Sequence, residues 1–103
     1  MAVDIGFAEN AEIDMDTEME DGLLFSDIME AWFEENAYNG YFHVQGVTAT
    51  KLIIDEVRIP VKEKSGRNYR VTKFAAKLRS FLVKRGYTVT RDVVGTKVFI
   101  QIE

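Results

Sequence analysis

Residues 72–102 read TKFAAKLRSFLVKRGYTVTRDVVGTKVFIQI, and this stretch decides the expected fold. Its first half places apolar side chains at steps of three and four residues, which predicts an amphipathic helix over residues 72–85. Its second half alternates apolar and polar residues on both sides of Gly95, which predicts a β-hairpin over residues 87–102. The inward stripe of the helix would consist of Phe74, Ala75, Leu78, Phe81 and Leu82.

Toward the N-terminus, two more helices and a short strand are predicted. Over residues 21–37 the apolar positions recur with helical spacing, and residues 41–45 are rich in strand formers. Residues 48–57 predict a second helix, between that strand and the 72–85 helix. The inward side of this second helix would consist of Leu52, Ile53 and Val57. The resulting order is that of an α+β winged helix-turn-helix domain, with three helices and a C-terminal β-hairpin as the wing.

Polar residues stand at the expected start of each helix. Asp21, Thr48 and Thr72 can each accept a hydrogen bond from a backbone N–H group of the first turn. Gly86 follows the third helix directly, where a left-handed residue commonly ends a helix. These four residues support the three predicted helix boundaries.

Charge is divided sharply along the chain. All thirteen Lys and Arg residues lie after residue 50, whereas twelve of the seventeen acids lie before it. Residues 1–20 are acidic and weakly periodic, so they are interpreted as a flexible acidic tail or linker, and residues 21–103 as the winged-helix domain. The acidic half also motivates a hypothesis: it could fold over the basic half and compete with a polyanion for it.

The basic residues gather on the expected third helix and beside it. A solvated helix face that only aids solubility is compatible with this pattern. The absence of acids between residues 64 and 91 nevertheless favours contact with nucleic acid. The predicted nucleic-acid-binding residues are Arg67, Arg70, Lys73, Lys77, Ser80, Lys84, Arg91 and Lys97.

Aromatic residues and the single histidine are weaker candidates for a site. Tyr69, Tyr87 and Phe99 could stack on unpaired bases, although aromatics near element ends more often pack against the core. His43 has no Cys or second His near it in the sequence, so a structural histidine is favoured over a catalytic one.

Three segments resemble the C-terminal domain of phage and plasmid primase–helicases, including the virulence-associated protein E group. They read YFHVQGVTATKLIIDEV, SGRNYRVTKFAAKLRSFLVKRGY and TVTRDVVGTKVFIQI, and cover roughly residues 41–102. Residues 47–52 resemble the helix-opening motif of that family, and residues 74–78 with 84–87 resemble its following helix. The resemblance implies a winged helix that serves DNA replication. The chain departs from the family in having no ATPase or primase part and no G-x-x-x-x-G-K-[ST] motif.

Composition excludes several other classes of function. There is no Cys and only one His, so neither a disulfide framework nor a zinc site is expected, and no cofactor or metal is predicted. No apolar run is long enough for a membrane span, and the N-terminus lacks the basic and apolar regions of a signal peptide, so a cytoplasmic location is expected. No arrangement of residues suits nucleophilic or acid–base catalysis, so the chain is not expected to be an enzyme.

The sequence therefore predicts a non-catalytic nucleic-acid-binding module in phage- or plasmid-type replication. Its partner would be DNA, either duplex or single-stranded, and possible further partners are a replication protein or the rest of a larger polypeptide. No membrane and no small-molecule substrate are expected. The alternative is a protein-interaction winged helix, such as a replication assembly factor or a phage-encoded inhibitor, which would use the acidic helix and the basic face.

Overall fold

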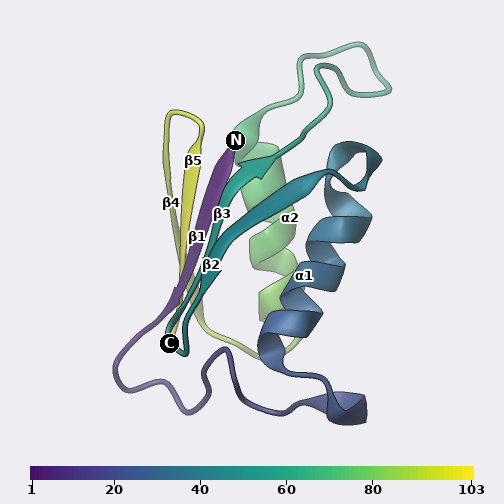
Figure 1. Cartoon of the computed structure of the whole chain (residues 1–103). Coiled ribbons are helices and arrows are strands. Elements are labelled where there is room, and N and C mark those ends of the chain that lie inside the picture. Colours follow the sequence, from purple (N-terminus) through teal and green to yellow (C-terminus); the bar gives the residue numbers. More distant parts are fainter.

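The computed structural model describes residues 1–103 and has two layers, a five-stranded mixed sheet and two α-helices that cover one face of it (Figure 1). The strand order is β2-β3-β1-β5-β4, and only the β1–β5 pair is parallel. The predicted three-helix winged helix-turn-helix fold is therefore wrong, and only its α+β class fits. The elements are β1 (Ala2–Phe7), α1 (Phe25–Asn36), β2 (Phe42–Val47), β3 (Lys51–Val57), α2 (Val71–Lys84), β4 (Val89–Val94) and β5 (Lys97–Ile102), with 3-10 turns at Glu20–Gly22 and Tyr38–Gly40.

The first strand overturns the expected acidic tail. β1 is the middle strand of the sheet, antiparallel to β3 on one side and parallel to β5 on the other (Figure 1). Its two inward side chains, Val3 and Ile5, are fully buried. Apolar alternation with a period of two is sufficient for a half-buried strand, and the acids around it concealed this short pattern. Because β1 is held on both sides, it cannot swing over the basic half as the competition hypothesis required.

The acidic segment between β1 and α1 is also tied to the fold. Met15 is fully buried, and its backbone N–H donates to the carbonyl of Ala49 at 2.7 Å. Asp14 organises the local turn, since its carboxylate accepts from the backbone N–H of Asp16 at 2.9 Å and from the Thr17 hydroxyl at 3.2 Å. Local hydrogen bonding of this kind is a common use of Asp outside helices.

The expected helix over residues 48–57 is wrong, because most of this range is strand β3. Leu52 and Ile54 point to the helices and are fully buried, whereas Ile53 faces the other side of the sheet. Thr48 does not cap a helix; its side-chain oxygen accepts from the backbone N–H of Lys51 at 3.1 Å, within the turn that joins β2 to β3. The predicted strand over 41–45 is confirmed as β2, with corrected ends at Phe42 and Val47.

Two of the predicted helices are confirmed, with corrected ends. α1 begins at Phe25 rather than at residue 21, and Asp21 lies instead in a 3-10 turn with φ 57°. The start of α1 is stabilised by Asp27, whose carboxylate accepts from the backbone N–H of Leu24 at 3.0 Å. In α2 the N-cap is Arg70, so Thr72 is already inside the first turn.

The predicted hairpin is confirmed as β4 and β5, but it is not a wing. β5 pairs with β1 along its whole length, so the hairpin forms one side of the central sheet. The inward residues of β5 are Val98, Ile100 and Ile102, all buried beneath α2 and its neighbours. A wing would project from the domain, whereas here the inward face of the hairpin forms part of the core.

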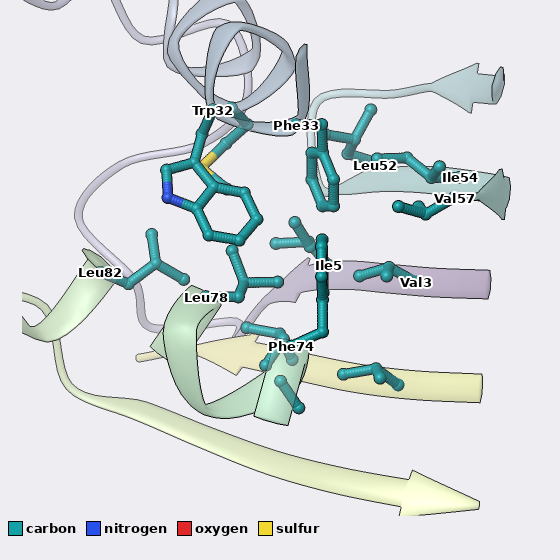
Figure 2. Packing of buried hydrophobic residues seen from close by; sticks show 14 of the residues in the cluster. Val3, Ile5, Trp32, Phe33, Leu52, Ile54, Val57, Phe74, Leu78 and Leu82 are labelled. Carbon is teal, nitrogen blue, oxygen red and sulfur yellow. The ribbon is translucent and has the colours of Figure 1, made fainter. Parts of the chain in front are cut away.

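The core lies between the helix layer and one face of the sheet (Figure 2). Phe33 from α1 and Phe74 from α2 are buried side by side, with ring centroids 6.1 Å apart. Trp32 lies between the two helices, with its ring centroid 5.3 Å from that of Phe74 and 5.9 Å from that of Phe81. Aromatic packing of this kind joins α1 to α2 and fixes where the outer face of α2 points.

Candidate functional site

The outer face of α2 carries four of the predicted residues in one row. Lys73, Lys77, Ser80 and Lys84 are all exposed, and together they border a shallow pocket of about 490 Å³. The opposite wall of this pocket is α1, through Trp32 and Asn36. The helical spacing in the sequence correctly placed this row, because i, i+4, i+7 and i+11 lie on one side of an α-helix.

A larger pocket of about 870 Å³, the polar pocket, lies where α2 begins and is lined by no hydrophobic residue. It is built from three segments: the loop after β3, the first turn of α2, and β4. Four cationic side chains and only one acid line it. The lining residues are Glu63, Gly66, Arg67, Asn68, Arg70, Thr72, Lys73 and Arg91.

The loop between β3 and α2 is folded as a small hairpin of its own, which projects beyond the end of the sheet (Figure 1). Lys62 and Asn68 form an isolated β-bridge, and the backbone N–H of Glu63 donates to the carbonyl of Arg67 at 2.8 Å. Gly66 has φ 87°, a left-handed conformation that glycine adopts without strain. The turn thereby brings Arg67 toward the start of α2.

The single acid of the polar pocket is already paired. The Glu63 carboxylate accepts a hydrogen bond from the Lys73 ammonium group. None of the three arginines, Arg67, Arg70 and Arg91, forms an ion pair with any acid of the chain. Like charges held close together repel one another, so the arrangement favours an added anion.

A third pocket, of about 550 Å³, lies on the other side of the projecting loop and combines lysines with tyrosines. Tyr38 is 49% exposed, and the Lys73 ammonium group lies 5.5 Å from the centre of the Tyr69 ring. Burial raises the pKa of the Tyr69 phenol above its usual value, so this group stays neutral at physiological pH. The lining residues are Tyr38, Pro60, Lys62, Glu63, Lys64, Ser65, Tyr69, Lys73 and Lys77.

Seven of the eight predicted residues are thus brought together around α2, and Lys97 is not. Lys97 lies on the sheet face that no helix covers, because its neighbour Val98 points into the core. There the Lys97 ammonium group lies 3.5 Å from the Asp4 carboxylate and 5.0 Å from the centre of the Phe99 ring. Phe99, a predicted stacking residue, is on this remote face too.

Other charged or aromatic candidates are occupied by structural contacts. The Arg85 guanidinium donates to Glu20 at 2.5 Å, and this hydrogen bond is the main reason that the pKa of Arg85 is raised. Tyr87 packs edge to face on Phe25, with the ring centroids 5.7 Å apart. His43 is exposed, and its Nδ1 lies 2.7 Å from the Asp55 carboxylate.

Sequence reasoning missed several members of the site. Lys62 and Lys64 lie in the loop between β3 and α2 and were not among the predicted binding residues, although the basic composition of this loop was a usable signal. Nothing in the sequence pointed to Tyr38, which reaches the third pocket from the turn after α1. Glu63 was also missed, since its role depends on Lys73 of the next element.

Comparison with known proteins yields one match. The family model described as "Domain of unknown function (DUF6175)" matches residues 1–103. No curated protein matches the chain, and no solved structure does. Separately, neither helix is long and apolar enough to cross a membrane.

Proposed function

We propose that this chain, which belongs to the DUF6175 family of domains of unknown function, binds nucleic acid without catalysis through the basic surface around α2. That surface is made of the three pockets described above. The observation that carries the proposal is the position of Lys73, which lines all three of them. The cationic residues of loop, helix and strand are therefore neighbours on one surface, as contact with an extended polyanion requires.

The neighbouring charges support a defined path along this surface. α1 carries Asp27, Glu34 and Glu35 on its exposed side, and no basic residue. These carboxylates would repel phosphate groups from α1 and direct a strand along α2 and toward the projecting loop. The acids of α1 would therefore form one boundary of the binding surface.

The aromatic residues favour a single strand over a duplex. Tyr38 and Tyr69 line the same pocket as four lysines. Tyrosine rings beside cations suit stacked, unpaired bases whose phosphates follow the cationic groups. A duplex would keep its bases stacked on each other and leave the tyrosines without this role.

The proposed interface is tested by two double variants with equal change of charge. K77Q/K84Q removes two cations from the outer face of α2, and K51Q/K97Q removes two from the remote face of the sheet. Fluorescence anisotropy would follow binding of a labelled single-stranded oligonucleotide across a salt series. We expect K77Q/K84Q to weaken binding and to reduce the slope of log K against log salt by about 1.4, since each phosphate contact on a single strand contributes about 0.7. K51Q/K97Q should bind as the parent protein does.

Other outcomes would count against the proposal. Equal weakening by both variants would indicate attraction by overall charge instead of a defined surface. No binding at low salt would exclude nucleic acid and favour a protein partner instead. For such a partner, the acidic α1 and the basic α2 offer two charged surfaces side by side. A cytoplasmic location and a part in phage- or plasmid-type replication are further proposals; the second rests on the resemblance of residues 41–102 alone.

A further inference from the structure

The polar pocket at the start of α2 has more positive charge than an internal phosphate diester needs. Arg67, Arg70, Lys73 and Arg91 converge there from three segments, against Glu63 alone. A diester carries one negative charge, whereas a phosphate monoester carries between about 1.5 and 2 at neutral pH and offers three terminal oxygens. The net positive charge of the pocket therefore suits the larger negative charge of a phosphate monoester.

The donor groups fit the same ligand. Each arginine presents a planar fork that can donate two hydrogen bonds to a pair of phosphate oxygens. The first turn of α2 contains no acid and its N-cap makes no side-chain hydrogen bond, so no carboxylate of the helix itself offsets its positive end beside Thr72. No hydrophobic residue lines the pocket, so a hydrated anion can enter it.

We propose that this pocket holds the terminal phosphate monoester of a nucleic-acid strand. The inference rests on the proposed function, and it names the part of the ligand that the pocket recognises. The first nucleotide of the strand would lie against Tyr38 and Tyr69, because Glu63 and Lys73 line both the polar pocket and the tyrosine pocket. The following phosphates would then pass along Lys77 and Lys84.

Glu63 acts as an internal competitor in this arrangement. Its carboxylate pairs with Lys73 in the absence of ligand, and an incoming phosphate must displace it or share that ammonium group. Replacing the carboxylate by an amide removes the competing charge and keeps the shape. The variant E63Q should therefore bind a phosphorylated strand more tightly than the parent protein does.

The test compares one single-stranded sequence with a 5′-phosphate, with a 3′-phosphate and with hydroxyl groups at both ends. We expect one of the phosphorylated forms to bind about tenfold more tightly than the unphosphorylated form, the effect of one or two charge-assisted hydrogen bonds. R67Q/R91Q should abolish this preference, and K77Q/K84Q should weaken all three strands by the same factor. Both pairs are exposed, and thermal unfolding of each variant would verify its fold.

The failures of the two proposals are distinguishable. Equal binding of all three strands would overturn the terminal-phosphate inference and leave nucleic-acid binding intact. Binding of none of them would overturn both. Inorganic phosphate serves as a competitor: if it displaces the phosphorylated strand at the strand's own concentration, the pocket recognises free phosphate and the inference is wrong. Tighter binding by the E63Q variant, restricted to the phosphorylated strand, would support it.

Discussion

Ile5 and Ile53 lie on neighbouring strands of the sheet and have opposite surroundings. Ile5 points to the helices and is fully buried, whereas Ile53 faces the uncovered side and is only half-buried. The sequence analysis placed Ile5 in a flexible tail and Ile53 on the inward side of a predicted helix. Single residues were misplaced because an isoleucine has the same hydrophobicity in either setting, and only strand pairing determines which face it occupies.

This difference predicts unequal effects of the same substitution. Ile5→Ala should lower the free energy of unfolding by about 2 to 5 kcal/mol, because it leaves a cavity in the middle of the core. Ile53→Ala removes the same atoms from a partly exposed position on the uncovered face and should cost about 1 kcal/mol or less. Urea unfolding followed by circular dichroism measures both. A larger loss for Ile53→Ala would contradict the orientation of β1 and β3.

At the scale of elements, periodicity was a reliable guide where a segment was long. The apolar stripe of α2 spans almost four turns and defines its inward face without help from other elements. β3 is seven residues long, and its Leu-Ile-Ile run fits either a short buried helix or a strand. The β-branched residues Ile53, Ile54 and Val57 favour the strand, because their side chains pack well on a pleated sheet.

The end of α2 provides a test at this scale. Gly86 follows the helix with φ 96°, a conformation that strains any residue with a Cβ atom. Gly86→Ala should destabilise the protein by about 1 to 2 kcal/mol through this backbone strain. Gly46→Ala is the matched control, because Gly46 has no positive φ and a Cβ there meets no atom within 4 Å. Thermal unfolding of both variants measures the difference, and equal melting temperatures would contradict the cap at Gly86.

At the scale of the whole molecule, the division of charge has a meaning different from the expected one. The acidic N-terminal half is part of the folded domain: it contains the central strand β1, the buried Met15 and the helix α1. Its position in the fold comes from Val3, Ile5 and Met15, which the count of acids obscured. Of its acids, Asp27, Glu34 and Glu35 lie on the exposed side of α1, the helix that packs beside α2.

Two alterations of the N-terminal segment separate these roles. Deleting residues 1–7 removes β1 and leaves β3 and β5 without a common neighbour, so cooperative unfolding should be lost. The variant E9Q/E12Q keeps the strand and removes only charge, so it should unfold as the parent protein does. Differential scanning calorimetry distinguishes them. A sharp, parent-like transition after the deletion would restore the interpretation of this segment as a tail.

The local sequence pattern was sufficient to predict α1, α2 and the β4–β5 hairpin, because the apolar periodicity of each can be read from consecutive residues. It also placed Lys73, Lys77, Ser80 and Lys84 in one row. The local pattern could not predict the middle position of β1 or the arrangement of the projecting loop, because both depend on partners distant in sequence. Because β1 pairs with β3 and β5, the hairpin is not a wing but the two strands on one side of the sheet. Arg91 pairs with the buried Ile100 and so lies on the helix side, where the polar pocket is, whereas Lys97 is next to the buried Val98 and so lies on the opposite face.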